Sequence, residues 1–171
     1  PPTAPKRAEE PAKPSDWTFS GALDMYHGWS SPRVGVGPVR IGRQFDLRNN
    51  QLQVATAQAT IKYRADKEGF GLTATPFIGD NADIPFGYDR TSSLWVKHFA
   101  EAYLTFKKKK LTLDLGKFYS WIGWEGVEVW NNDLYSRALL YTIVQPNYHT
   151  GLRATYAFND ALDRMLSRAS S

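Results

Sequence analysis

The chain has 171 residues, enough for one domain with a substantial core, and its formal net charge is +4. Four basic residues stand together at 107–110; the other 17 equal the 17 acidic residues, so one solvated turn explains the excess and argues against a nucleic-acid-binding surface. No cysteine is present, which excludes disulfide frameworks and thiol chemistry.

Residues 1–16 are predicted to be a disordered tether rich in proline, alanine and lysine. They hold five of the ten prolines, mixed charges and no aromatic residue. Such a composition buries too little apolar surface to fold and favours polyproline-like conformations. The composition changes sharply at Trp17, so we expect the folded part to span residues 17–160.

From Trp17 onward the chain is predicted to form six β-strands in which apolar and polar residues alternate. In the second strand the apolar residues change parity midway, as a β-bulge requires. The aromatic content of 14% at a mean hydropathy of −0.46 suits strands with one apolar and one polar face. The predicted strands are 17–29, 51–63, 70–79, 99–107, 111–118 and 148–158.

The connections between these strands alternate strictly between long and short. A long loop follows the first strand, and two more lie at 80–96 and 119–147, while tight turns are expected near 66–69, 107–110 and 159–160. Tight turns join consecutive strands as antiparallel neighbours, so the fold class is all-β, an antiparallel up-and-down sheet. Short turns at one end and long loops at the other are typical of transmembrane β-barrels.

Six sequence blocks resemble, in order, the OmpL-like putative β-barrel porin family of Gram-negative bacteria. They cover nearly all of the chain from Trp17 to Asp160. The resemblance implies an outer-membrane porin-like channel for passive diffusion of small hydrophilic solutes, with no catalytic residues and no cofactor. It also implies contact with outer-membrane lipid, periplasmic tight turns and tether, extracellular long loops, and a possible homo-oligomer. The blocks are "WTFSGALDMYHGW", "RQFDLRNNQLQV", "GFGLTATPFIGDNAD", "AYLTFKKKKLTLDLGKF", "WNNDLYSRALL" and "YHTGLRATYAFND".

Residues 161–171 lack both the alternation and the family character, and we expect them to form a short helix or coil. Members of this family continue past the sixth strand, and eight strands are the fewest in a known bacterial barrel. We therefore expect the chain to be the N-terminal half of a barrel, truncated or frameshifted, that fails to insert alone. Closure by oligomerisation is the alternative.

Charged and histidine residues on the polar alternate positions are the candidate pore-lining residues. In a channel they would bias which ions pass, whereas as cross-strand ion pairs they would only fill and hydrate the lumen. Both interpretations stay open. The candidates are Asp24, Glu101, Asp114, His149 and Arg153.

The longest loop, 119–147, is the candidate constriction. It carries Glu125, Glu128 and Asp133 within reach of Arg137, so a loop folding inward could set a transverse field across the pore. A short helix within "LYSRALLYTIV" is expected. An external cap packed on the rim is the equal alternative.

The sequence contains no arrangement of residues that is typical of an enzyme active site. His27, His98 and His149 lie on separate strands or their ends, without the spacing of a metal site or a nucleophilic triad. The alternative to a porin is a soluble β-barrel or β-sandwich that binds a small ligand or glycan, with the leucines converging into a closed interior.

Overall fold

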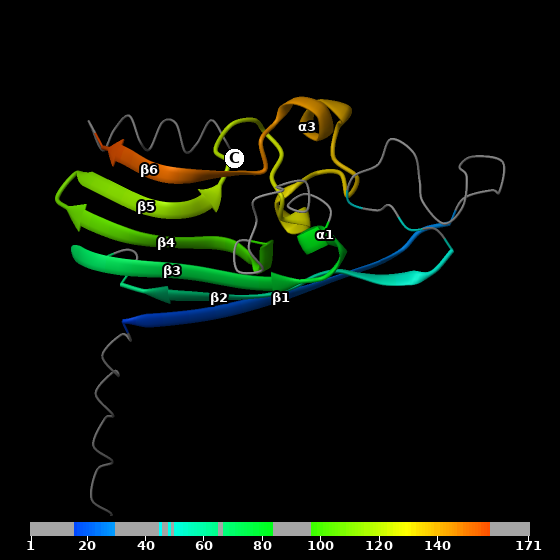
Figure 1. Ribbon diagram of the computed structural model, residues 1–171, viewed down its shortest axis with the longest axis horizontal. Coiled ribbons are helices and arrows are strands. Elements are labelled where there is room, and N and C mark those ends of the chain that lie inside the picture. The colour runs from blue at the N-terminus through cyan, green and yellow to red at the C-terminus, as the bar shows by residue number, and fades with distance from the viewer. Residues whose placement is uncertain are drawn as a thin grey trace, which may run out of the picture.

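A computed structural model of the chain describes residues 16–29, 45, 48, 50–64, 67–83 and 97–157. Within these residues six strands form one sheet, and every neighbouring pair is antiparallel (Figure 1). Sheet order follows sequence order, which confirms the predicted up-and-down topology. The strands are β1 (Trp17–His27), β2 (Leu52–Tyr63), β3 (Gly69–Ile78), β4 (Phe99–Lys108), β5 (Leu111–Tyr119) and β6 (Tyr148–Tyr156).

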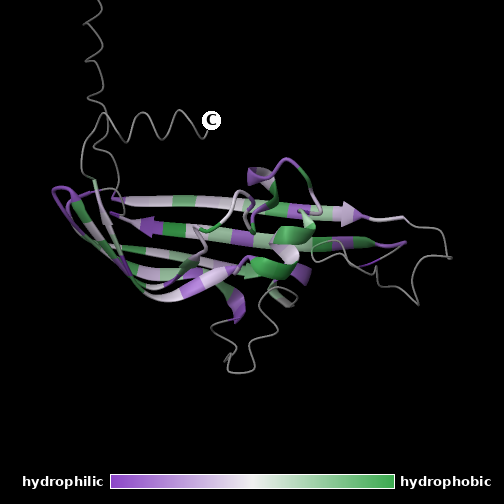
Figure 2. Cartoon of the chain, turned by 90° about the horizontal axis from the view of Figure 1, so that it is seen from above, coloured by the Kyte–Doolittle hydropathy of each residue, from purple (hydrophilic) through white to green (hydrophobic). Residues whose placement is uncertain are grey.

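The sheet is open, with β1 and β6 as its edges. Its strands are 9 to 12 residues long, close to the roughly 9–11 residues of a tilted membrane-spanning strand. Figure 2 shows the strands curving around the side on which the short helices lie, and hydrophobic and hydrophilic residues alternating along them.

One side of the sheet, here called the apolar face, carries a row of leucines that crosses four strands. Leu104 pairs with both Leu72 and Leu115, and Leu115 pairs with Leu152. Leu104 is 57% exposed and Leu152 is 66% exposed. The leucines therefore point away from the chain instead of converging into a closed interior.

The expected β-bulge lies in β2. Asp24 pairs with Thr56 and Met25 with Val54, so Ala55 has no partner and the parity of the following residues is inverted. Ala55 is fully buried, and Gly79 approaches it so closely that a Cβ on Gly79 would lie 2.6 Å from its carbonyl oxygen.

A second register shift occurs between β3 and β4, where Thr75 pairs with Glu101 and the next residue, Pro76, pairs with Phe99. Proline has no N–H to donate to a ladder, so a bulge beside it costs little.

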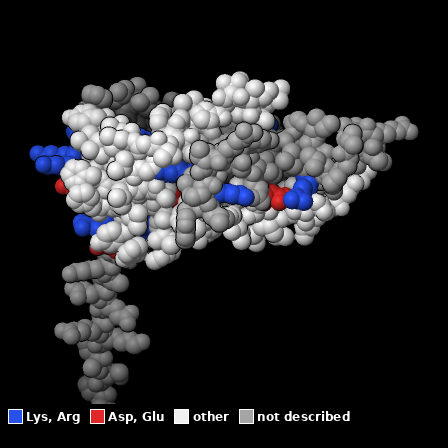
Figure 3. Space-filling model, viewed as in Figure 1, with Lys and Arg blue, Asp and Glu red and all other residues white. Residues whose placement is uncertain are grey.

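The Lys109–Lys110 turn and the 120–147 connection lie at opposite ends of the sheet, as Figure 1 shows, whereas residues 30–44, 84–96 and 158–160, where other connections were predicted, lie outside the described residues. The tight end contains the Lys109–Lys110 turn, and Lys and Arg side chains gather there in Figure 3. The other end carries α1 (Asp80–Asp83), the 3-10 helix η1 (Val129–Asn131) and α3 (Leu139–Val144). None of the helices in the described residues is long and apolar enough to cross a membrane. The predicted tether, apart from Asp16, and the 161–171 tail lie outside the described residues.

The hydrophobic core is small and lies at the long-loop end, where connections pack on the sheet. Phe77 of β3 and Ala100 of β4 contact side chains from the loops and from α1 and α3. The ring of Tyr141 of α3 is tilted against that of Phe45 at a centroid distance of 5.7 Å. The core consists of Phe45, Phe77, Ala82, Ala100, Val127 and Tyr141.

Candidate functional site

The side opposite the leucine row, here called the polar face, carries all five predicted pore-lining residues. Strand register decides this, since Glu101 pairs with Thr75, Asp114 with Thr105 and Arg153 with Asp114. Each is next in sequence to a residue of the apolar face, because successive side chains of a strand point to opposite faces. The five residues are Asp24, Glu101, Asp114, His149 and Arg153.

Asp114 and Arg153 form a cross-strand ion pair between β5 and β6. Arg153 donates from Nε and Nη2 to Oδ2 of Asp114 at 3.0 and 2.8 Å, while Thr105 Oγ1 donates to Oδ1 at 2.7 Å. The guanidinium also lies 4.4 Å from the centroid of the Phe118 ring. Only 5% of Asp114 is exposed, so this carboxylate is held by its partners and is not available to passing solutes.

His149 belongs to a separate cluster at the long-loop end of β6. Its Nε2 lies 3.1 Å from Ser120 Oγ, and its ring lies 4.5 Å from that of Trp121. The other two histidines lie elsewhere, His27 at the end of β1 and His98 before β4. Among the described residues no group of three or more His, Cys, Asp or Glu side chains could hold a metal ion.

The connection between β5 and β6, residues 120–147, folds across the polar face toward β1 and β2. Gln58 Nε2 of β2 donates to Glu128 Oε1 at 2.8 Å, and Tyr135 Oη donates to Asp24 Oδ2 of β1 at 3.1 Å. The Tyr135 ring also lies 5.9 Å from that of Tyr26. These two hydrogen bonds therefore hold the loop over the side of the sheet that carries the charged residues.

The charged residues of this loop make their hydrogen bonds to backbone groups and to neutral side chains. Arg137 is buried and donates to the carbonyl oxygens of Gly126, Val127 and Tyr135. Glu125 accepts from the backbone N–H of Ala138 at 2.8 and 3.0 Å.

Asp133 is exposed to solvent, and Glu128 faces β2. Burial lowers the pKa of Arg137. The buried Arg137 guanidinium stabilises the loop from inside, because it donates to three backbone carbonyl oxygens. It also lies 3.9 Å from the centroid of the Phe45 ring.

A polar cavity of about 340 Å³ lies between the loop and the polar face. Glu101 of β4 accepts from the backbone N–H of Tyr119 at 3.2 Å, and Glu128 also accepts from Asn131 Nδ2 at 2.8 Å. Charged, amide, hydroxyl and aromatic side chains thus share one small space. The residues that give it this character are Ser20, Gln58, Thr60, Lys62, Glu101, Tyr119, Glu128 and Trp130.

Most of these residues were not among the candidates from the sequence. Gln58, Thr60 and Lys62 share the polar parity of β2 once the bulge is placed at Ala55, so the alternation contains the signal for them. Nothing in the sequence pattern places Trp130, because the path of the loop depends on contacts with distant strands.

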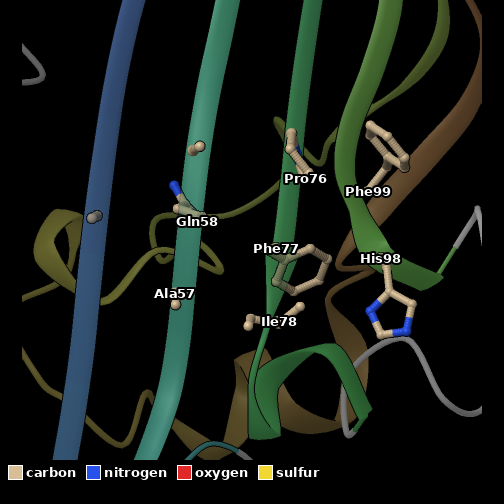
Figure 4. Close-up of a pocket in the computed structure, with 9 residues that line it drawn as sticks. Ala57, Gln58, Pro76, Phe77, Ile78, His98 and Phe99 are labelled. Carbon is tan, nitrogen blue, oxygen red and sulfur yellow. The ribbon is translucent and has the colours of Figure 1, made fainter.

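A larger groove, of about 670 Å³, lies at the long-loop end where β2, β3 and the start of β4 meet. Figure 4 shows Pro76, Phe77, Phe99 and His98 around it. Its lining is mostly alanine, proline and aromatic or branched apolar residues, and Ala57, Pro76 and Ile78 belong to the apolar face. This groove is a depression in the exposed apolar surface and contains no convergent set of polar groups.

A family described as putative beta-barrel porin-2, OmpL-like, matches residues 16–168. The matched region includes all six strands and continues past Asp160, where we expected the family character to end. No curated protein and no solved structure matched the chain. The match covers most of the chain and agrees with the observed sheet, and the chain therefore belongs to the OmpL-like family of putative beta-barrel porins.

Proposed function

We propose that this sheet is part of the wall of a passive, water-filled channel in the bacterial outer membrane. The observation that carries the proposal is the division of the sheet into an exposed leucine row on one side and charged residues beneath a loop on the other. Lipid would cover the apolar face, and water and small hydrophilic solutes would occupy the polar face.

A channel wall cannot leave β1 and β6 unpaired in lipid. Each unsatisfied backbone group in the hydrocarbon region costs several kcal/mol, so spanning sheets are closed. The proposal therefore includes further strands beside both edges, contributed by a longer chain or by a second copy. Since β1 and β6 run in opposite directions, an even number of added strands would close the barrel with antiparallel pairs throughout.

The orientation belongs to the same proposal. The tight turns would lie in the periplasm and the long connections outside the cell, as in other barrels with short turns at one end. The 120–147 loop, which is hydrogen-bonded to β1 and β2, would then narrow the outer part of the channel, since it extends over the polar face instead of capping the rim.

Planar-bilayer recordings test the proposal on an assembly whose edges are paired, either a longer chain that includes these six strands or an oligomer of this chain refolded in detergent. We expect discrete conductance steps and no reaction chemistry. Glu101→Lys should shift the reversal potential toward anion selectivity, because it reverses a charge on the polar face. The matched control is Glu68→Lys, which changes the same residue type in an exposed tight turn and should leave selectivity unchanged. Absence of conductance from both the longer chain and the oligomer, or equal effects of both variants, would contradict the proposal.

A further inference from the structure

We infer that the cavity beneath the 120–147 loop is a binding subsite for a neutral polyhydroxylated solute about the size of a monosaccharide. The inference rests on the proposed function, since solutes reach this cavity through the water on the polar face. Its volume of about 340 Å³ lies at the lower end of the range of small-molecule pockets, about 300 to 1,000 Å³.

The polar groups of the cavity provide both donors and acceptors, as a polyol requires. Glu101 and Glu128 provide carboxylate acceptors, and Lys62 and Gln58 provide N–H donors. Ser20 adds a hydroxyl, which can donate or accept. Vicinal hydroxyl groups can donate to a carboxylate and accept from an ammonium or amide at the same time, which a simple ion cannot.

Both carboxylates are held in place before any solute arrives. Glu128 accepts from Gln58 on one oxygen and from Asn131 on the other, and Glu101 accepts from the backbone N–H of Tyr119 on Oε1. A carboxylate oxygen has two acceptor directions, so each retains capacity for a solute hydroxyl. Positions held in advance lower the entropic cost of binding.

The aromatic residues of the cavity favour a solute with an apolar side. Trp130 is 46% exposed and lines the cavity opposite the strands, and Tyr119 lines it beside Glu101. A sugar ring presents C–H groups on its faces and hydroxyls at its edge, which matches aromatic rings next to polar side chains. The mixed signs, two carboxylates against Lys62, favour a neutral solute over a strongly charged one.

Saturation-transfer NMR on the refolded chain in deuterated detergent micelles tests this inference, with D-glucose as the probe and choline as a cationic comparison. We expect saturable glucose binding with a Kd of about 1 mM or weaker, given the few hydrogen bonds available. Glu101→Gln and Lys62→Gln should each weaken it about tenfold, the effect of losing a charged hydrogen-bond partner. Trp130→Ala should abolish it.

Asp133→Asn is the matched control, because Asp133 belongs to the same loop, is exposed and does not line the cavity. It should bind glucose as the parent does. Lys62 is exposed, so its variant provides a test even if another substitution disturbs folding. Saturable binding of choline in preference to glucose would overturn the inference, as would equal loss in Asp133→Asn.

Two results separate this inference from the proposed function. Conductance in planar bilayers without saturable glucose binding would overturn the subsite and leave the channel intact. Saturable glucose binding that depends on Glu101 and Trp130, in an assembly with paired edges that never conducts, would support the subsite and contradict the channel.

Discussion

Gly116 shows how one residue controls the spacing of two strands. It lies opposite Tyr103 in the β4–β5 ladder and has a φ of +143°, a conformation that side chains rarely adopt. A Cβ there would collide with the carbonyl oxygen of Ala102 and lie 2.7 Å from the Cα of Tyr103. Only glycine allows the backbones of β4 and β5 to approach in this way.

Gly116→Ala should therefore lower the free energy of unfolding by about 1–3 kcal/mol, the usual cost of forcing atoms into a packed site. Urea unfolding of the refolded chain in detergent, followed by tryptophan fluorescence, measures the change. Gly126→Ala is the control, because a Cβ there meets nothing within 4 Å and φ is not positive. Equal effects of the two substitutions would contradict the steric explanation.

The Asp114–Arg153 pair supports a second residue-scale prediction. Asp114→Ala leaves the Arg153 guanidinium beside Phe118 without its carboxylate, and the stability should fall by about 2 kcal/mol, as for other hydrogen bonds to charged groups. The same unfolding measurement applies. Asp133→Ala should change stability by less than about 0.5 kcal/mol, because its side chain is exposed. A similar loss in both would show that the pair does not stabilise the sheet.

At the scale of the element, β5 and β6 separate two surfaces by alternation alone. Leu115 is 58% exposed on the apolar face, whereas Thr155 is exposed on the polar face. Leu115→Lys should cost about 2–4 kcal/mol in a bilayer if the residue lies at the midplane, and Thr155→Lys should cost little. Reversible unfolding from lipid vesicles measures both. If the two lysines cost the same, the apolar face does not contact lipid.

The 120–147 loop should open at alkaline pH. Burial first, then the nearby Asp24 carboxylate, raises the pKa of the Tyr135 phenol well above its ordinary value of 10.0. A raised pKa means that the folded state favours the neutral phenol, so its contribution is complete below about pH 10 and is lost as the pH rises toward the folded-state pKa. The hydrogen bond from Tyr135 to Asp24 should therefore weaken as the pH rises above about 10.

Limited proteolysis of the loop as a function of pH measures this opening. The parent should become more susceptible as the pH rises above about 10, the ordinary pKa of a tyrosine. Tyr135→Phe cannot ionise or donate to Asp24, so its loop should be susceptible already at neutral pH with a smaller alkaline increase. An identical pH profile in both proteins would show that Tyr135 does not hold the loop.

For the whole molecule, an open sheet predicts uneven protection of backbone amides. In β2, β3, β4 and β5 neighbours lie on both sides, whereas the outer edges of β1 and β6 have none among the described residues. Hydrogen exchange in detergent should be slowest in the four inner strands and faster at every second amide of the two edges. In lipid under conditions that give conductance, the edge amides should become protected, because a channel requires closure. Protection of the edges that does not change between these conditions would contradict closure by added strands.

Local alternation and turn lengths were sufficient to predict the six strands, their order and the bulge in β2, because side-chain periodicity and tight turns act between near neighbours. The face of Asp24, Glu101 and Arg153 followed from the same parity.

Only the tertiary structure decided where the 120–147 loop lies and which partners its charges have. Tyr135 and Asp24 are 111 residues apart, and Arg137 binds carbonyl oxygens instead of the nearby acids. No local pattern encodes such contacts, since burying a guanidinium depends on which backbone groups the folded chain leaves unpaired around it.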